Sequence, residues 1–468
     1  MKVLFAAAEA APLVRVGGLA EVIGSLPRTL NKLGHDVRVI LPCYGAIDTS
    51  RLSCTTVMDG IEVPAAPTDK SISVQYTQPL PGLQVYLIDN PVFSTSRSVY
   101  GDDDLPRFLF FCHAVTEILK KLDWKPDIVH CHDWHAGLIP MLLKAEGNNC
   151  PSIFTIHNLA YQGNFDFEFL VQSGLQDWWQ RPANAPEPPL CFMGQGILWA
   201  DFITTVSKTY AAEILTPEYG AGLDNLLRYR QDKLSGIING LNYEEYNPET
   251  DDFIPDKYGV DTIGNKRNNK HALQKEAGFN EDDKIPLLGM VTRLDEQKGI
   301  DILEAGLERL FSTCKCQLVI LGQGRDEYQH LLSRAASRYS DQLAVFIDYD
   351  ERMGHLVYAG CDMFLMPSRY EPCGLGQLIA MRYGTVPIVR HTGGLVDTVQ
   401  DLTPDLKRGS GFVFQEYSTE AMMSAIQRAL GSFQNNAWEQ VVERIMALDF
   451  SWQSSAVKYE SLYRKVMG

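Results

Sequence analysis

A single carboxylate and a glycine-containing turn follow an apolar segment in the second half of the chain. Met363–Pro367 has the composition of a buried strand, Glu371 lies in the loop after it, and a helix follows. In open α/β sheets, ligands bind at the carboxyl ends of the strands, so Glu371 suits the hydroxyls of a polar substrate and the helix start suits an anion such as phosphate. The alternative is that Glu371 only caps its helix. The turn residues expected to contact substrate are Cys373, Gly374, Leu375 and Gly376.

Two further glycine pairs occupy the same kind of position. Gly393-Gly394 follows the apolar segment Val386–Arg390, and Gly17 and Gly18 follow the first apolar segment of the chain. Three strand–glycine–helix turns predict one anionic ligand held by backbone amides. Arg15, just before Gly17, would add a cation beside that ligand, although a solvated surface arginine is the alternative.

Two cations lie five residues apart in the motif VTRLDEQKG. Arg293 and Lys298 follow the predicted strand Pro286–Val291 and precede a predicted helix. Such a pair can converge on one diphosphate, the arginine through its planar fork and the lysine as a point charge. The alternative is that both are solvated and pair with nearby acids of the same loop.

The histidine-rich stretch HCHDWH, residues 130–135, invites comparison with metal sites. A strand through Cys131 sends His130 and His132 to one face, and the position of Asp133 does not match metal-binding hydrolase motifs. We therefore expect substrate-contacting and structural residues here. The acidic run 102–104 precedes a helix and is interpreted as an N-terminal cap cluster. Neither a metal site nor a cofactor is predicted.

Two other side chains lie at predicted strand ends. His157 closes the strand Ser152–His157, and Tyr349 follows the strand Leu343–Ile347, where its ring could stack on a nucleobase. A satisfied structural histidine and a core tyrosine are the alternatives.

The elements that position these residues alternate between strand and helix over most of the chain. A chain of 468 residues exceeds one typical core, and the acidic, proline-containing stretch 242–258 predicts a boundary. We expect an α/β protein of two Rossmann-like, doubly wound domains facing each other across a cleft, residues 1–243 and 244–452, followed by a helix at 453–468. The stretch 61–90 predicts a small antiparallel insertion.

Composition excludes several classes of partner. A net charge of -16 and a pI near 5.1 argue against nucleic acid or an anionic membrane surface. No apolar run approaches membrane-spanning length, and Glu9 interrupts the apolar start, so neither a membrane helix nor a signal peptide is expected. Ten scattered cysteines without a C-x-x-C pair indicate a reducing compartment, the cytoplasm.

Taken together, the motifs resemble those of the glycogen and starch synthases that use ADP-glucose. The resemblance extends from Lys2 to about Trp452 and is carried by VGGLAEVIGSLP, YGDDDLPRF, HCHDWHAGL, TIHNLAYQG, TTVSKTYAAEI, INGLNYEEYNPETD, RLDEQKG, PSRYEPCGLGQL and VRHTGGLVDTV. It implies a GT-B glycosyltransferase that transfers glucose from ADP-glucose to the non-reducing end of an α-1,4-glucan or maltooligosaccharide, with retention of configuration. It implies an acceptor role for the first domain and a nucleotide-sugar role for the second.

The same resemblance assigns roles to residues. Arg293 and Lys298 would hold the diphosphate, Glu371 the glucose hydroxyls, and Tyr349 the adenine. The residues that would surround the reacting sugar are His157, Asp133 and Asn239. Three positions depart from the usual pattern: Arg15 replaces a lysine, Glu21 an aspartate, and Gly376 a hydroxyl residue. The alternatives are another sugar-nucleotide transferase of this fold, making sucrose or a glycolipid, and a glucan-binding paralogue with a degraded site.

Overall fold

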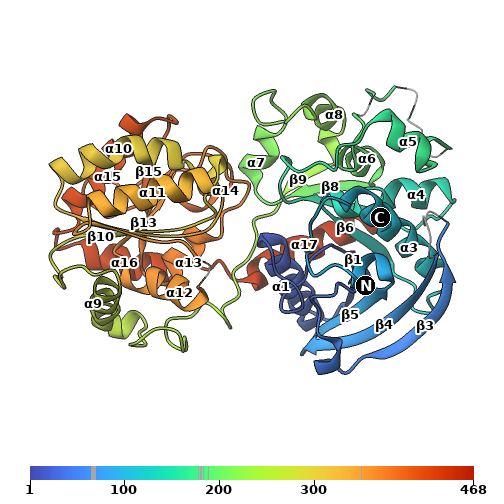
Figure 1. Cartoon of the computed structure of the whole chain (residues 1–468), viewed down its shortest axis with the longest axis horizontal. Helices are drawn as coiled ribbons and strands as arrows, with labels where there is room; N and C mark the ends of the chain where they lie inside the picture. The colour runs from blue at the N-terminus through green and yellow to red at the C-terminus, as the bar shows by residue number, and fades with distance from the viewer. Residues whose placement is uncertain (65–69, 178, 180–181, 183, 188, 349) are drawn as a thin grey trace. The chain divides into compact units, whose positions relative to one another are not determined.

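The computed structural model describes residues 1–64, 70–177, 179, 182, 184–187, 189–348 and 350–468. The chain forms two compact units, which we call the N-terminal unit (Met1–Gly240 with Trp452–Gly468) and the C-terminal unit (Leu241–Ser451). Figure 1 shows each unit as a sheet with helices packed on it. The boundaries predicted from the sequence, after residues 243 and 452, differ from these by one to three residues.

The N-terminal unit contains a nine-stranded sheet among its described residues, in the order β3-β4-β5-β2-β1-β6-β7-β8-β9. The pairings of β4 with β3 and with β5 are antiparallel, and the other pairings are parallel. The predicted antiparallel insertion is therefore one edge of the main sheet. The strands are β1 Lys2–Ala6, β2 Asp36–Pro42, β3 Thr55–Glu62, β4 Ser71–Leu80, β5 Leu83–Asp89, β6 Ile128–His132, β7 Ser152–Ile156, β8 Phe202–Thr205 and β9 Leu234–Gly236.

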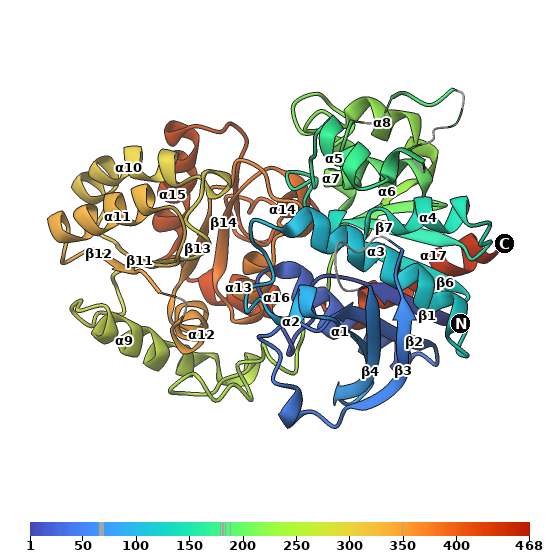
Figure 2. The same cartoon turned by 45° about the vertical axis from the view of Figure 1, so that its right-hand side comes forward.

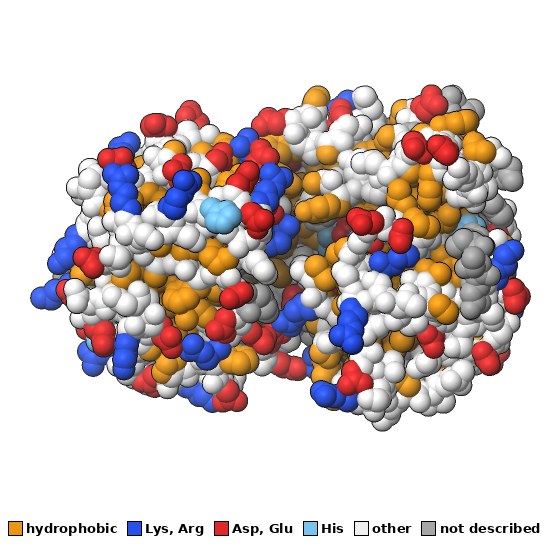
Figure 3. Space-filling view, viewed as in Figure 1, with side chains coloured by type: hydrophobic (Ala, Val, Ile, Leu, Met, Phe, Trp, Pro, Cys, Tyr) orange, Lys and Arg blue, Asp and Glu red, His pale blue; other side chains and the backbone are white. Residues whose placement is uncertain are grey.

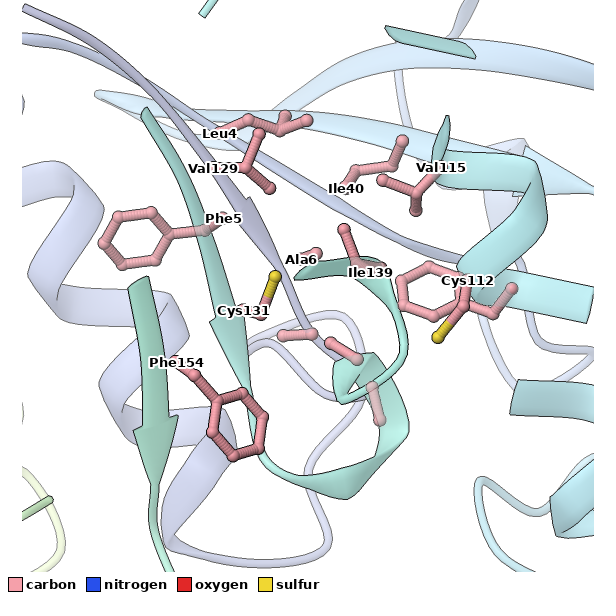
Figure 4. Close-up of a cluster of buried hydrophobic side chains, with 14 of the residues drawn as sticks. Leu4, Phe5, Ala6, Ile40, Cys112, Val115, Val129, Cys131, Ile139 and Phe154 are labelled. Atoms are coloured by element: carbon pink, nitrogen blue, oxygen red, sulfur yellow. The ribbon is translucent and has the colours of Figure 1, made fainter. Parts of the chain in front are cut away.

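Helices cover both faces of this sheet, and the apolar strands β1, β6 and β7 are buried between them. Figure 4 shows part of this core, with labelled side chains from β1, β2, β6, β7, α3 and α4. Phe5 of β1 points away from Cys112 and Val115 of α3. The helices of the unit are α1 Gly18–Lys32, α2 Pro91–Ser94, α3 Asp104–Lys121, α4 Ile139–Ala145, α5 Phe167–Gln172, α6 Phe192–Trp199, α7 Lys208–Glu213, α8 Asp224–Tyr229 and α17 Trp452–Met467.

Helix α17 returns from the C-terminal unit and packs on the N-terminal unit beside α1 (Figures 1 and 2). Its side chains Ala456, Tyr459 and Tyr463 are buried in the N-terminal core. The hydroxyl of Ser455 donates to the carbonyl of Ile238, 2.6 Å away, just before the chain leaves the unit. The last helix thus completes a core that the first 240 residues begin.

The C-terminal unit contains a six-stranded parallel sheet among its described residues, in the order β12-β11-β10-β13-β14-β15. This is the strand order of a Rossmann fold. All strands are parallel, and the order in which successive strands are added changes direction between β10 and β13. The strands are β10 Leu287–Val291, β11 Gln317–Leu321, β12 Leu343–Phe346, β13 Met363–Met366, β14 Val386–Arg390 and β15 Phe412–Phe414. The helices are α9 Lys266–Glu276, α10 Ile300–Thr313, α11 Asp326–Arg338, α12 Glu351–Gly360, α13 Gly376–Arg382, α14 Gly393–Thr398, α15 Thr419–Ser432 and α16 Trp438–Met446.

The parallel sheets explain where side chains for chemistry are found. The N-terminal sheet reverses its order in the same way, between β1 and β6, so each unit has a switch point at which the loops after two central strands diverge and leave room for a ligand. In the face shown in Figure 3, acidic and basic side chains are interspersed over both units. Within the described residues, no helix is both long enough and apolar enough to cross a membrane.

Candidate active site

At the switch point of the C-terminal unit, a lysine and a glutamate form an ion pair. Lys298 Nζ lies 2.7 Å from Glu371 Oε2, and the two side chains are 16% and 7% exposed. Lys298 follows β10, in the short 3₁₀ segment Glu296–Lys298, and Glu371 follows β13. Because β10 and β13 are neighbouring parallel strands, their carboxyl ends bring together two residues that are 73 positions apart in the sequence.

Hydrogen bonds to backbone carbonyls hold the loop of Lys298 and the loop of Glu371 against each other. The amide of Arg369 donates to the carbonyl of Gln297 over 2.8 Å, and Gln297 Nε2 donates to the carbonyl of Tyr370 over 3.2 Å. Gly299 has φ +72°, and a Cβ there would lie 2.1 Å from the carbonyl oxygen of Pro367. A larger residue at 299 would therefore push apart the loops that carry Lys298 and Glu371.

The loop of Glu371, residues 367–375, is also fixed by its other neighbours. Ser368 Oγ donates to Glu371 Oε2 over 2.9 Å, and the amide of Gly394 donates to the Glu371 carbonyl over 2.9 Å. Gly393-Gly394 thus supports the Glu371 loop through at least one amide, whereas the sequence predicted that these amides bind the ligand. A Cβ on Gly393 would lie 1.9 Å from the Glu371 carbonyl oxygen, so only glycine fits.

The turn at 373–376 begins helix α13, as predicted. Gly374 has φ +73°, and Gln377 Nε2 donates to the carbonyls of Cys373 and Gly374 over 3.1 and 2.8 Å. Leu375 and Gly376 form the helix start, whose first amides have no partner inside the helix. Sequence reasoning missed Ser368 and Gln377, because no periodicity marks a polar side chain that supports a loop.

Arg293 lies on the same loop as Lys298 and is more exposed. Its guanidinium is paired with Asp295 at 3.0 Å and donates to Gln297 Oε1 at 3.2 Å, with a side chain 51% exposed. Its pairing with Asp295 agrees with the interpretation of Arg293 as a loop charge. Its position at the switch point, with an accessible planar fork, agrees with the interpretation as a diphosphate-binding cation.

At the switch point of the N-terminal unit, Asp133 follows β6 in a strained conformation. Its φ of 56° and ψ of -180° lie in a region that residues other than glycine rarely adopt. Asp133 Oδ1 accepts hydrogen bonds from the amides of His157 and Asn158 over 2.7 and 3.5 Å. Burial raises the pKa of Asp133 to about 7, and these amide hydrogen bonds oppose the rise. Stored strain beside a perturbed carboxyl is typical of a functional site.

His157 contacts this carboxylate through its backbone and a second histidine through its ring. His157 Nε2 lies 3.0 Å from Nδ1 of His132, and burial lowers the pKa of His157 to about 3. The imidazole is therefore neutral at physiological pH. It is a hydrogen-bonding group at the strand end where the sequence predicted it.

The other histidines of the 130–135 stretch have structural roles. His130 is buried between Thr155 Oγ1 and the hydroxyl of Tyr463, at 2.6 and 2.9 Å, and His135 stacks on Tyr100 with ring centroids 5.2 Å apart. Among the described residues, no group of three or more His, Cys, Asp or Glu side chains is arranged to hold a metal ion.

The acidic run 102–104 lies at the start of α3, as predicted. Asp104 accepts a hydrogen bond from the amide of Gly101 over 2.9 Å and pairs with Arg107 at 3.4 Å. Asp103 is the residue that caps the helix, but its side chain makes no capping hydrogen bond.

The glycine turn before α1 differs from its predicted role. The amides of Val16 and Gly17 both donate to Oε2 of the buried Glu9 over 2.8 Å, and Tyr100 donates to the other carboxylate oxygen of Glu9. These two amides therefore bind a carboxylate of the chain itself. Gly18 begins α1, with Gly17 as its N-cap. This role of Glu9 is not predictable from the sequence, because Glu9 lies within an apolar, strand-like run.

Arg15 is paired with Glu21, with 2.7 Å between Nε and Oε1, and the two side chains are 32% and 17% exposed. Two of the three departures from the usual motif pattern are thus in contact with each other. Arginine and glutamate are longer than the lysine and aspartate that they replace in the usual pattern. They form one ion pair at the start of α1, which orients the guanidinium.

Asn239 and Tyr349 are the other two residues that were predicted to contact substrate. Asn239 lies three residues beyond β9, buried at 5% exposure, and its Oδ1 has no hydrogen-bond partner among the described residues. A buried amide oxygen without a partner is costly unless a ligand or water supplies the donor. Tyr349 lies outside the described residues.

Comparison with known proteins agrees with this arrangement. Residues 2–229 match the family described as starch synthase catalytic domain, and residues 270–438 match the family described as glycosyl transferases group 1. The chain is 44% identical to the glycogen synthase of Geotalea daltonii, covering 100% of this chain and 99% of that protein. It is 44% identical to the glycogen synthase of Moorella thermoacetica, covering 100% and 97%.

Solved structures give the same result. The catalytic domain of starch synthase IV from Arabidopsis thaliana, bound to ADP and acarbose, matches with a TM-score of 0.90 and 33% identity over 100% of this chain and 99% of that one. Sucrose-phosphate synthase from Thermosynechococcus elongatus shares the fold, with a TM-score of 0.61 and 18% identity over 99% and 98%. The prediction of two Rossmann-like domains of the GT-B type is confirmed. The chain belongs to the glycogen synthase family and is a glucosyltransferase of glycogen or starch synthesis.

Proposed function

We propose that this enzyme transfers glucose from ADP-glucose to the non-reducing end of an α-1,4-glucan and retains the anomeric configuration. The observation that carries the proposal is the ion pair of Lys298 and Glu371, 2.7 Å apart at the switch point of the C-terminal unit. A cation there suits a diphosphate, and a carboxylate beside it suits sugar hydroxyls. The ADP in the starch synthase IV structure supports an adenine nucleotide as donor.

The reaction breaks the bond between the anomeric carbon and the diphosphate oxygen and forms a bond from that carbon to an acceptor hydroxyl oxygen. Negative charge develops on the leaving diphosphate, which Lys298 and Arg293 stabilise as fixed cations. Glu371 accepts hydrogen bonds from the glucose hydroxyls. Glycosidases place a second carboxylate across the bond. Here one carboxylate is paired with a lysine, so the leaving phosphate oxygen receives the proton of the acceptor hydroxyl on the same face.

The two units are proposed to divide the substrates. The C-terminal unit binds the nucleotide sugar through Arg293, Lys298 and Glu371. The N-terminal unit binds the glucan, with Asp133, His157 and Asn239 around the reacting sugar. The strain at Asp133 supports this, as does the buried Oδ1 of Asn239, for which the described residues supply no donor. All ten cysteines, each within the described residues, are free thiols, which fits the proposed cytoplasmic location.

Donor and acceptor are tested together by incubating the enzyme with ADP-glucose or UDP-glucose, with and without maltooligosaccharide, and following release of the nucleoside diphosphate. We expect rapid release from ADP-glucose that depends on maltooligosaccharide. Faster release from UDP-glucose would overturn the donor assignment, and release that maltooligosaccharide does not stimulate would overturn the acceptor assignment.

Arg15→Ala is expected to weaken ADP-glucose use severely, whereas Arg15→Lys keeps kcat/KM within about tenfold, roughly 1.4 kcal/mol of transition-state stabilisation. The lysine retains a cation for the diphosphate and loses only the planar fork. Steady-state kinetics on both variants measure this. Glu21→Gln is the matched control, since it removes the ion pair and keeps Arg15. An Arg15→Ala enzyme with unchanged kcat/KM for ADP-glucose would remove this residue from the site.

Removal of divalent metal is expected to leave turnover unchanged. Arg293, Lys298 and the amides at the start of α13 supply the positive charge that a metal ion supplies in other glycosyl transfers. The measurement is the initial rate after treatment with a chelator. Loss of activity that added Mn²⁺ or Mg²⁺ restores would contradict the prediction.

A further inference from the structure

Two imidazole rings from neighbouring strands are joined by a hydrogen bond in the N-terminal unit. His132 ends β6 and His157 follows β7, which pairs with β6 in parallel. Nδ1 of His132 lies 3.0 Å from Nε2 of His157. His132 is fully buried, and its Nε2 has no hydrogen-bond partner within the described part of the chain.

A hydrogen bond between the two facing nitrogens requires one proton. That proton is bonded either to Nε2 of His157 or to Nδ1 of His132. If His157 donates, a neutral His132 must carry its own proton on Nε2, which leaves a buried N–H without an acceptor. If His132 donates from Nδ1, its bare Nε2 is left as an unused acceptor. Buried N–H groups without partners are rarer than buried acceptors without partners. The second assignment is therefore favoured, and it leaves His157 Nε2 as the acceptor.

Both rings are neutral, and a neutral imidazole carries one proton. If one nitrogen of a ring accepts a hydrogen bond, the proton must therefore be on the other nitrogen of that ring. Burial lowers the pKa of His157 to about 3, and burial together with the neighbouring histidines lowers that of His132 well below its usual range. A neutral His157 that accepts at Nε2 carries its single proton on Nδ1. Nδ1 of His157 makes no hydrogen bond within the described residues.

We propose that His132 is a positioning residue that fixes His157 as the tautomer with its proton on Nδ1, so that His157 offers a hydrogen-bond donor to an oxygen of the sugar substrate. This inference rests on the proposed function of His157 beside the reacting sugar. His132 itself does not touch substrate. It determines which nitrogen of His157 donates, as second-layer partners determine the tautomer of histidines in metal sites.

His130 holds His132 in place from the other side. The rings of His130 and His132 have centroids 4.2 Å apart, and both nitrogens of His130 are hydrogen-bonded, to Tyr463 of α17 and Thr155 of β7. Phe5 contacts both rings, with centroids 4.7 and 4.9 Å away. The ring of His132 therefore has a fixed orientation, which a tautomer-determining donor requires.

The tautomer is measured directly on the wild-type chain labelled with ¹⁵N-histidine. Long-range ¹H–¹⁵N correlation spectra distinguish a proton on Nδ1 from one on Nε2, and the His157→Gln spectrum identifies the signals of His157. The expected result is a neutral His157 with its proton on Nδ1. A proton on Nε2 of His157 would overturn the proposal. This readout does not depend on which sugar nucleotide is the donor, so it can fail or succeed independently of the proposed function.

Two variants of His132 test the consequence for catalysis. His132→Leu removes the donor and is expected to lower kcat by about ten- to a hundredfold, as for other residues that orient a histidine, and to let His157 adopt the other tautomer. His132→Asn, whose amide can donate from near the position of Nδ1, should recover most of that loss. The control His113→Leu removes a different buried histidine of the same unit and should change neither the tautomer of His157 nor kcat. An unchanged His157 tautomer and wild-type kcat in His132→Leu would contradict the proposal.

Discussion

Lys298→Ala is expected to lower kcat by about two to three orders of magnitude, as the loss of a preorganised donor to a developing anion does in other enzymes. Lys298 is only 16% exposed and lies 2.7 Å from Glu371, so its ammonium group is already in place before charge develops on the diphosphate. Water that enters the truncated site must reorient during the reaction and stabilises the leaving group less well. The measurement is kcat for nucleoside diphosphate release at saturating ADP-glucose and maltooligosaccharide.

Removal of Lys298 also leaves the carboxylate of Glu371 without its cation, so stability must be measured separately. Breaking one partner of a buried pair is more destabilising than removing both. The double variant Lys298→Met with Glu371→Gln should therefore regain stability relative to the single variant and remain inactive. Lys275→Ala, an exposed lysine on α9, is the control for loss of a cation on the same unit. Near wild-type kcat in Lys298→Ala would show that the reaction centre lies elsewhere.

Glu371→Ala is expected to be comparably damaging to turnover, with the fold intact. Its carboxylate is held by Lys298 and by Ser368 Oγ, and its backbone carbonyl is held by Gly394. The side chain is therefore presented in one orientation, as a group that must select among sugar hydroxyls requires. Circular dichroism and a thermal unfolding curve establish that the variant is folded, and kcat/KM for ADP-glucose gives the loss.

Glu371→Gln separates the charge of this residue from its shape. The amide keeps an acceptor for Ser368 and nearly the same volume, but it has no charge for the sugar hydroxyls or for Lys298. We expect its kcat to lie between those of the wild type and of Glu371→Ala. Equal, wild-type turnover in both variants would leave Glu371 without a role in the reaction and favour the alternative that the sequence left open, a residue that only caps its helix.

The strand-end residues were predictable because parallel α/β sheets leave clear patterns. Lys298 and Glu371 each follow a short apolar strand, and once the strand order is that of a Rossmann fold, the loops after β10 and β13 must be neighbours. The ion pair between them was not predictable. Cation and carboxylate were expected to act on separate parts of the substrate, and only the register of β10 with β13 shows that they touch.

Contacts that depend on irregular loops could not be predicted. Glu9 lies in an apolar run, where its charge indicates only that the segment is not a signal peptide, yet its carboxylate accepts hydrogen bonds from the amides of Val16 and Gly17. Arg15 and Glu21 were seen as two separate departures, and their ion pair depends on the path of the chain into α1. β3 was missed because its burial pattern is mostly exposed and lacks apolar alternation. It forms an edge of the sheet, where little apolar surface is buried.

The linkage formed in the product tests directly whether the enzyme transfers glucose from ADP-glucose to a glucan with retention of configuration. The enzyme is incubated with ADP-glucose labelled with ¹³C at the anomeric carbon of glucose and with maltooligosaccharide, and the product is analysed by NMR. We expect the label in a new α-1,4 linkage, on a glucose at the non-reducing end, in amounts equal to the ADP released. Label in a β linkage, at the reducing end, or only in free glucose would contradict this expectation.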